Sequence, residues 1–328
     1  MEQSAGHEPL NPQQTAQALP YLDLSACVEA LLRDPTVSVP PRIVHALAGG
    51  GSLFVMPASD SRVAITKLIT FVADNASRQL PSIQGDVMVF DARNGQRLHI
   101  LDGPTVTARR TAAVSLLAAQ KLAPKPGGKL LIVGAGVQGR SHLEAFVAGL
   151  GVREVLIASR SGSSAEALVA HARSLGVQAE RVADPDRALA ECSLVVTSTS
   201  AQEIAIRSLP RDDAFISAVG AFTPRMVEWA PQVCVHVARH GRIVVDTRDA
   251  DHEAGDLLQA GLDVTGFASL GDVINECSHW NGDAHGTGPV FFKSCGWAGW
   301  DLAAARCIGN RSAGNTALHN ELSGRGFP

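Results

Sequence analysis

The residues best suited to chemistry form a glycine-rich turn at positions 134–139, GAGVQG, with the spacing G-x-G-x-x-G. The turn directly follows Lys129–Val133 (KLLIV), which is typical of a buried strand, and opens a helix predicted over Val137–Gly149. Gly134 permits the tight bend, Gly136 lets the backbone approach a pyrophosphate, and Gly139 lets helix and strand pack closely. Free N–H groups at the helix start favour bound phosphate. The pattern therefore predicts a dinucleotide site.

The next predicted strand, Glu154–Ala158, ends in Ser159-Arg160-Ser161. An NAD site usually places an acidic residue there to bind the ribose 2′-hydroxyl, and none is present. The planar guanidinium of Arg160 suits a 2′-phosphate, and the serines can donate hydrogen bonds to it. The sequence predicts NADPH as the cofactor, with NADH used more weakly. The alternative is that Arg160 is a solvated surface charge.

Besides the glycine turn and Arg160, Lys67 is a candidate for a functional residue, because it interrupts an apolar run, AIT-K-LITFV. Burial lowers the pKa of a lysine, and such a group can bind an anion or exchange a proton near neutral pH. Taken by itself, the residue pattern also allows an ordinary surface cation, since lysine is mostly exposed in folded proteins.

Two kinds of secondary structure must position these residues. Asn94-Gly95 predicts a hairpin with a type I′ turn, whose two central residues have positive φ, and so an antiparallel sheet in the first third. Its predicted strands are Ser52–Met56, a run within Arg62–Ala73, Asp86–Phe90 and Arg97–Leu101. A helix over Thr111–Leu122 then ends before the breaker cluster at 124–128, PKPGG. We predict the domain boundary there.

Beyond this boundary, strands and helices alternate, which predicts right-handed βαβ units and a parallel sheet. Further strands are expected at Ser193–Ser198, Ala214–Val219 and Arg242–Asp246, and a helix at Ser164–Leu175. A last helix over Trp297–Ile308 is expected to pack back on the first domain. Residues 1–19 are expected to form a loose arm.

Composition narrows the class of protein. The chain has 328 residues, 45% of them apolar, and its formal net charge is −4. That balance indicates a globular protein and no electrostatic footprint for nucleic acid or an anionic membrane. Six scattered cysteines without a C-x-x-C pair favour a reducing compartment. No signal peptide or transmembrane run is evident, so a cytoplasmic protein is predicted.

Several short motifs, in order, resemble the ornithine cyclodeaminase/mu-crystallin family. They are Met56-Pro57 with Lys67; the segment 107–113 (TARRTAA); the turn 133–138 (VGAGVQ); the segment 219–224 (VGAFTP) with Glu228; and 292–296 (FKSCG). Together they span roughly residues 40 to 305. The resemblance implies an α/β architecture in which a Rossmann domain (123–296) is inserted into a discontinuous α+β substrate-binding and dimerisation domain (1–122, completed by 297–328). It also implies a homodimer.

The same resemblance implies roles for individual residues. Lys67 and Arg110 match the family's carboxylate-binding and proton-relay cations, and Glu253 matches an acid near the cleft. Arg42, Met56 and Phe222 are implied on the substrate side. The predicted cofactor-binding residues are Thr111, Gly134, Gly136, Val137, Gln138, Gly139, Ser159, Arg160, Ser161, Thr197, Val219 and Gly220. No metal site is expected.

Departures from the cyclodeaminase pattern separate members of the family. Phe54 stands where cyclodeaminases carry an acid, and 220–222 reads Gly-Ala-Phe in place of Gly-Gly-Asp. Ser159 stands where an aspartate is usual. These changes resemble reductases of cyclic imino acids, so we predict NADPH-dependent reduction of Δ1-pyrroline-2-carboxylate to L-proline, and of its six-membered homologue Δ1-piperideine-2-carboxylate to L-pipecolate.

Three alternatives remain open at this point. One is different chemistry in the same family, as in ornithine cyclodeaminase or alanine dehydrogenase. Another is a non-catalytic NADPH-binding protein that stores a ligand, which the intact pair Lys67 and Arg110 disfavours. The third is a metalloenzyme using His236 and His240, whose i, i+4 spacing lacks the glutamate of H-E-x-x-H.

Overall fold

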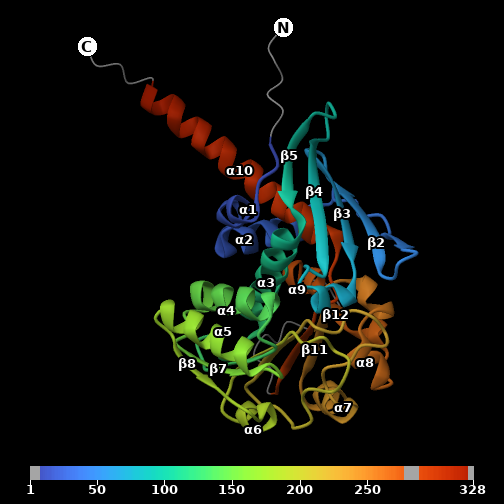
Figure 1. Ribbon diagram of the computed structural model, residues 1–328, viewed down its shortest axis with the longest axis vertical. Coiled ribbons are helices and arrows are strands. Elements are labelled where there is room, and N and C mark those ends of the chain that lie inside the picture. Colours follow the sequence, from blue (N-terminus) through green and yellow to red (C-terminus); the bar gives the residue numbers. More distant parts are fainter. Residues whose placement is uncertain (1–7, 277–287, 324–328) are drawn as a thin grey trace. The chain divides into compact units, whose positions relative to one another are not determined.

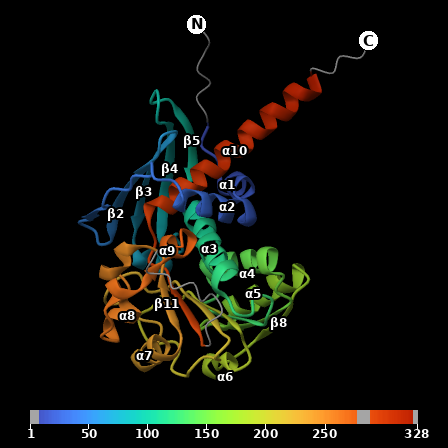
Figure 2. The same ribbon diagram turned by 180° about the vertical axis from the view of Figure 1, so that it is seen from behind.

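The computed structural model describes residues 8–276 and 288–323. The chain forms two compact units (Figures 1 and 2). The first comprises Met1–Arg110 and Trp297–Pro328, and the second comprises Thr111–Gly296. Among the described residues, no helix has both the length and the apolar character needed to cross a membrane.

The first unit is built on a five-stranded antiparallel sheet. Its strands pair in chain order: β1 (Ile43–Ala46), β2 (Ser52–Ser59), β3 (Val63–Phe71), β4 (Ile83–Asp91) and β5 (Arg97–Asp102). The 3-10 helix η1 (Ala73–Arg78) connects β3 to β4. Helices α1 (Pro12–Ala18), α2 (Tyr21–Leu32) and α10 (Ala298–Ser323) complete the unit, and α10 packs on β2, β3 and α2. The discontinuous α+β arrangement is therefore confirmed.

The amino-terminal segment differs from the prediction of a loose arm. Asn11 caps α1: its side chain accepts from the backbone N of Gln14 at 2.9 Å, and the Gln14 side chain accepts from the backbone N of Asn11 at 3.0 Å. Leu10 forms a β-bridge with Leu101, and Leu19 is fully buried. The prediction is wrong for residues 8–19, because the polar residues there form a capping box. Residues 1–7 lie outside the described part.

The hairpin between β4 and β5 is confirmed, but its turn is not type I′. Gly95 has φ +74°, whereas Asn94 is not among the residues with positive φ. The backbone N of Gly95 donates to the carbonyl of Asp91 at 2.9 Å, and the Asn94 side chain accepts from the backbone N of Gln96 at 2.8 Å. The turn is thus longer, with glycine alone in the left-handed region.

The second unit holds an eight-stranded sheet in the order β12-β11-β13-β10-β9-β6-β7-β8, with every pair parallel. The parallel sheet predicted from the alternating pattern is confirmed. Its strands are β6 (Leu130–Val133), β7 (Glu154–Ala158), β8 (Gln178–Arg181), β9 (Leu194–Thr197), β10 (Phe215–Ala218), β11 (Arg242–Val245), β12 (Ala268–Ser269) and β13 (Val290–Lys293). Its helices, seen in Figures 1 and 2, include α4 (Val137–Leu150), α5 (Gly162–Ser174), α6 (Pro185–Leu189), α7 (Pro231–His240), α8 (Gly255–Gln259) and α9 (Leu270–Ile274). Two 3-10 helices, η2 (Arg248–His252) and η3 (Val264–Gly266), lie among them.

The border between the units falls inside a helix. Helix α3 spans Gly103–Leu122, and the division lies between Arg110 and Thr111 rather than after Leu122. The breaker cluster at 124–128 follows the end of the helix, but residues 111–122 of α3 already belong to the second unit, which contains the parallel sheet. Its Ser115 hydroxyl is hydrogen-bonded to His142 Nε2 at 2.9 Å and accepts from Ser217 at 2.8 Å.

Candidate active site

Two of the predicted cations of the first unit meet at one buried carboxylate. Lys67 lies in the middle of β3 with 1% of its surface exposed, and its Nζ is 2.8 Å from Oδ2 of Asp301. Arg110 of α3 places Nε 3.4 Å from Oδ1 of the same carboxylate. Asp301 lies in the first turn of α10 and is fully buried. The sequence prediction missed Asp301.

The alternation of β3 explains why Lys67 points inward. Ile65, Lys67 and Ile69 share the buried face of the strand, since side chains two apart in a strand lie on one side. The register pairs Lys67 with Met56 on β2 and with Val87 on β4, and both neighbours are buried and uncharged. Because α10 packs on β2 and β3, the inward lysine reaches a residue of that helix.

Burial and charge set the proton affinity of Lys67. The pKa of Lys67 is lowered to about 8: burial lowers it most, the guanidinium groups of Arg110 and Arg42 lower it as well, and the Asp301 carboxylate opposes them. A lysine with this pKa is largely protonated at neutral pH but loses its proton just above. The ammonium group is therefore available both to hold an anion and to exchange a proton.

Arg42 and Met56 join this cluster from neighbouring elements. Met56 is directly opposite Lys67 in the sheet, and Arg42 immediately precedes β1. The Arg42 guanidinium carbon lies 6.0 Å from the ring centroid of Phe54, which is on the same face of β2 as Met56. The position that would carry an acid in cyclodeaminases thus presents an aromatic ring beside a cation.

The glycine turn of the second unit borders a hollow of about 490 Å³. Five of the predicted cofactor residues line it: Gly134, Gly136, Ser159, Arg160 and Ser161. The segment that follows β9, residues 198–205, also lines it. The hollow lies at the carboxyl ends of β6, β7 and β9, which is where parallel sheets bind nucleotides.

The three glycines of the turn differ in what a side chain would meet. A Cβ on Gly134, whose φ is +109°, would be 2.5 Å from the carbonyl oxygen of Ser198, and one on Gly139 would collide with the carbonyl of Gly134. A Cβ on Gly136 would meet no atom within 4 Å. Gly134 and Gly139 therefore serve the packing of the turn itself, while the open side at Gly136 faces space a ligand can fill.

Helix α4 begins at Val137 with no side-chain cap at Gly136. Its first N–H groups are thus left for a ligand or water. Gln138 is half-buried, and its Oε1 is a buried acceptor with no hydrogen-bond partner among residues 8–276 and 288–323. Val137 is exposed. This end of the turn offers both donors and an acceptor.

Arg160 lies at the mouth of the same hollow. Its Nη2 donates to Ser200 Oγ at 2.8 Å, and Nη1 lies 3.4 Å from Glu203 Oε1. Both charged side chains are largely exposed, so this pair adds little to stability. Ser161 caps α5 by accepting from the backbone N of Ser164 at 3.2 Å. The arginine is therefore free to exchange these partners for an anion.

A buried carboxylate organises the carboxyl ends of β9 and β10. Glu228 accepts from the backbone N of Thr199 and of Gly220, both at 2.7 Å, and from the Thr197 hydroxyl at 2.9 Å. Burial and the nearby Asp256 carboxylate raise the pKa of Glu228. Of the predicted cofactor residues, Thr197, Val219 and Gly220 lie at these strand ends rather than on the lining of the hollow.

The remaining predicted residues are not joined to a site by the described geometry. Thr111 is buried in α3, Phe222 is half-buried after β10, and Glu253 follows η2. All three belong to the second unit. Their roles stay predictions.

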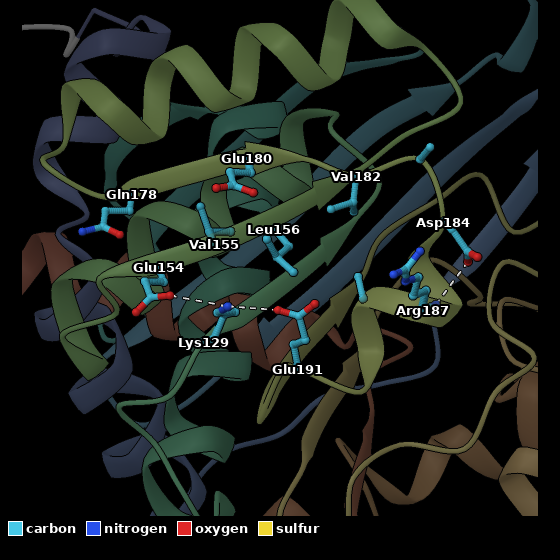
Figure 3. A pocket seen from close by; sticks show the side chains of 12 residues that line it. Lys129, Glu154, Val155, Leu156, Gln178, Glu180, Val182, Asp184, Arg187 and Glu191 are labelled. Carbon is cyan, nitrogen blue, oxygen red and sulfur yellow. Dashed lines mark hydrogen bonds and ion pairs between the residues drawn. The ribbon is translucent and has the colours of Figure 1, made fainter.

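A second hollow of the same unit, of about 400 Å³, reaches the amino ends of β6, β7 and β8 (Figure 3). Its lysine is paired with two of its acids: Lys129 Nζ lies 3.1 Å from Glu191 and 3.5 Å from Glu154. It contains none of the predicted site residues. It is lined by none of the residues of the glycine turn, which distinguishes it from the hollow at the carboxyl ends of β6, β7 and β9.

The histidine pair considered for a metal lies at the end of a helix. His236 and His240 are in the last turns of α7 with ring centroids 4.5 Å apart, and His240 Nδ1 is 3.0 Å from the carbonyl of His236. Within the described residues, no group of three or more His, Cys, Asp or Glu side chains is placed to hold a metal ion.

A parallel sheet, a glycine turn and a hollow at its carboxyl edge define a Rossmann-type dinucleotide-binding protein. The family model of the ornithine cyclodeaminase/mu-crystallin family matches residues 15–316. The chain belongs to this family, as the motifs predicted.

Two relatives extend over most of the chain. The Delta(1)-pyrroline-2-carboxylate reductase 1 of Burkholderia multivorans is 38% identical over 297 residues, covering 89% of this chain and 92% of the relative. A Delta(1)-pyrroline-2-carboxylate/Delta(1)-piperideine-2-carboxylate reductase of Azospirillum brasilense is 37% identical over 298 residues, with the same coverage of both chains. These relatives confirm that the chain is an oxidoreductase that uses a nicotinamide dinucleotide.

A solved structure has the same fold. It is an archaeal alanine dehydrogenase dimer with bound NAD, and it superposes with a TM-score of 0.81 at 22% identity, covering 93% of this chain and 95% of the other.

Proposed function

We propose that this protein reduces a cyclic imino acid with NADPH, converting Δ1-pyrroline-2-carboxylate to L-proline and Δ1-piperideine-2-carboxylate to L-pipecolate. The observation that carries the proposal is the buried pair of cations, Lys67 and Arg110, in a unit that has no counter-charge for them other than Asp301 among the described groups within ion-pair distance. Such a pair suits a small carboxylate. The two relatives named above act on these imino acids by their names.

The residues of the glycine turn fit the cofactor. The open side of Gly136, the uncapped N–H groups of α4 and the guanidinium of Arg160 would hold its phosphates, and Gln138 Oε1 offers an acceptor. When bound, the nicotinamide supplies the hydride. Of the protein's own residues, Arg110 and Lys67 bind the substrate carboxylate. Lys67 also holds a proton that the substrate nitrogen can take up when the C=N bond is reduced.

One experiment tests the substrate class. NADPH oxidation is measured with Δ1-pyrroline-2-carboxylate, with Δ1-piperideine-2-carboxylate, and with pyruvate plus ammonia, and ornithine is tested separately for ammonia release. We expect turnover of the two cyclic imines. Reduction of pyruvate with ammonia alone would indicate an alanine dehydrogenase, and ammonia release from ornithine would indicate a cyclodeaminase; either result would contradict the proposal. The ring of Phe54 argues against the cyclodeaminase, because it cannot exchange a proton with an amino group.

Cofactor choice is expected to depend on Arg160. Replacing it with glutamine should lower the ratio of kcat/KM for NADPH to that for NADH by about 10–100-fold, because hydrogen bonds to a charged group contribute about 1.5–3 kcal/mol. The exposed Arg140 of α4, which pairs with Glu144, provides a matched control. Arg140→Gln should leave the ratio unchanged. An unaltered ratio in Arg160→Gln would mean that Arg160 does not bind the 2′-phosphate.

We also propose that the protein is a homodimer joined through the outer face of the antiparallel sheet. Antiparallel sheets normally present polar residues on a solvated face. Beside polar residues such as Asp86, the face opposite α10 carries apolar side chains from all five strands, none of them fully buried: Ile43, Leu53, Val55, Leu68, Met88, Phe90 and Ile100. Ile43 is 61% exposed and Leu68 is 44% exposed. A second copy of the same sheet would cover these groups, as symmetric dimers do.

Light scattering coupled to size-exclusion chromatography tests the dimer. Leu68→Lys should convert the protein to a monomer, because it places a charge in the centre of the proposed interface while its backbone position stays compatible with the sheet. Leu209→Lys is the control, since Leu209 is a 51% exposed leucine of the second unit. A dimer that survives Leu68→Lys would exclude this face.

The same proposal places the enzyme in the cytoplasm. The cysteines of the described segments are not joined in disulfides, as a reducing compartment favours; they are Cys27, Cys192, Cys234, Cys295 and Cys307. Cys277 lies outside the described residues.

A further inference from the structure

Asp301 differs from the other fully buried carboxylates of the chain in what it binds. Glu228, Asp246 and Asp256 each accept at least two backbone N–H groups and so hold loops and strand ends in place. Asp301 accepts no hydrogen bond of that kind among the described residues. Its contacts are the ammonium group of Lys67 and the guanidinium of Arg110.

Burying the Asp301 carboxylate costs folding free energy, and its pairing with the two cations is what offsets that cost. A buried charge is stable only when it is paired, and a buried pair stabilises a fold little compared with apolar residues of the same volume. Helix α10 already has a separate anchor to the sheet side, because Arg306 pairs with Asp60 and, at 2.6 Å, with Asp34. Helix α10 thus has an attachment to this unit that does not involve Asp301.

The charges also leave a binding capacity. Asp301 approaches Lys67 at Nζ and Arg110 at Nε, and no second carboxylate among residues 8–276 and 288–323 lies within ion-pair distance of either cation. Two cations and one carboxylate leave one positive charge, which matches one carboxylate ligand. Because one carboxylate contacts both cations, it restricts the orientation of both side chains.

We propose that Asp301 is the positioning residue of the substrate site, holding Lys67 and Arg110 as one unit toward the substrate carboxylate and keeping Lys67 protonated. This rests on the proposed function for the identity of the anion. The contacts of Asp301 with Lys67 and Arg110 do not depend on the identity of that anion.

The groups around Lys67 determine what losing the carboxylate would do. Asp301 faces it from α10, Arg110 from α3 and Arg42 from the segment before β1, while the adjacent strand neighbours Met56 and Val87 are uncharged. Asp301 is the single anion among these groups. Without it, burial and two cations all disfavour the charged ammonium, so the pKa of Lys67 must fall below its value of about 8.

The proton affinity of Lys67 can be measured without any substrate. The chain has only five lysines, so ¹³Cε NMR of labelled lysine should resolve them, and the Lys67 signal is the one lost in Lys67→Arg. In the full-length protein we expect a midpoint near pH 8, and in Asp301→Asn a midpoint about 1–3 pH units lower. An unchanged midpoint in Asp301→Asn would overturn the proposal.

The same shift should be visible in turnover. If the alkaline limb of kcat/KM reports Lys67, it moves to lower pH in Asp301→Asn by the amount that NMR shows. The substrate's own ionisation is common to both proteins and cancels in the comparison. A wild type without imine turnover would contradict the proposed function alone, because the NMR midpoints still decide the role of Asp301.

Two further variants separate positioning from folding. Asp60→Asn removes another buried carboxylate that pairs with α10, so it should lower the melting temperature without moving the Lys67 midpoint. Asp301→Glu keeps the charge but displaces it by one methylene. We expect its Lys67 midpoint to stay near that of the wild type while kcat/KM falls at least tenfold. Wild-type kcat and KM in Asp301→Glu would overturn the proposal even if Asp301→Asn failed to fold.

Discussion

Replacing Arg110 with alanine is expected to lower kcat/KM for Δ1-pyrroline-2-carboxylate by about 10²–10³-fold. Removing one partner of a buried charge pair usually costs about 2–5 kcal/mol, and here the substrate carboxylate would lose its planar partner. Arg110 is 6% exposed and its Nε lies 3.4 Å from Asp301, so the loss should fall on substrate binding and transition-state binding together. Steady-state kinetics with saturating NADPH measures it.

The neighbouring arginine provides the control. Arg109 donates through Nε to the carbonyl of Leu19 at 2.6 Å, and its guanidinium carbon lies 3.9 Å from the ring centroid of Tyr21. Arg109→Ala should therefore lower the melting temperature but leave KM for the imine unaltered. Near wild-type activity in Arg110→Ala, or equal losses in both variants, would remove Arg110 from the substrate site.

Replacing Gly136 with alanine is expected to weaken NADPH binding by at least about tenfold while leaving the melting temperature of the ligand-free protein unchanged. The added methyl group meets no atom within 4 Å, and the backbone of Gly136 (φ −87°, ψ −163°) is one that alanine adopts readily. The methyl group would instead occupy the side by which a pyrophosphate approaches the turn. Titration calorimetry and thermal denaturation give the two quantities.

Gly139→Ala is expected to behave in the opposite way. Its methyl group would collide with the carbonyl oxygen of Gly134, so β6 and α4 must separate and the melting temperature should fall even without ligand. Unimpaired NADPH binding by Gly136→Ala would show that the cofactor does not approach this turn.

The sequence was most informative where a function depends on neighbours along the chain. The spacing of Gly134, Gly136 and Gly139 directly after a buried strand identifies a turn whose geometry is local. The inward orientation of Lys67 follows from the alternation of β3. The family motifs extend this information to Arg110, which no local pattern distinguishes from Arg109.

Asp301 could not be found in this way. It lies in the stretch WDLAAARC at the start of a helix, where an aspartate is an ordinary first-turn residue that favours the helix dipole. Its role arises only because α10 returns to a sheet formed more than 200 residues earlier. The error at residues 8–19 has a related cause: their polar composition conceals the β-bridge of the half-buried Leu10, the buried Leu19 and a capping box.

The return of α10 has a consequence for the protein during its synthesis. A ribosome releases the second unit, Thr111–Gly296, before the residues that complete the first. Domains generally fold as units as the chain emerges, at about 5–20 residues per second. Until Asp301 and Arg306 have left the ribosome, Lys67 has no counter-charge and Asp60 has no cation. The second unit can thus fold before Asp301 is synthesised, whereas Lys67 and Arg110 gain their shared carboxylate only after residue 301 has left the ribosome.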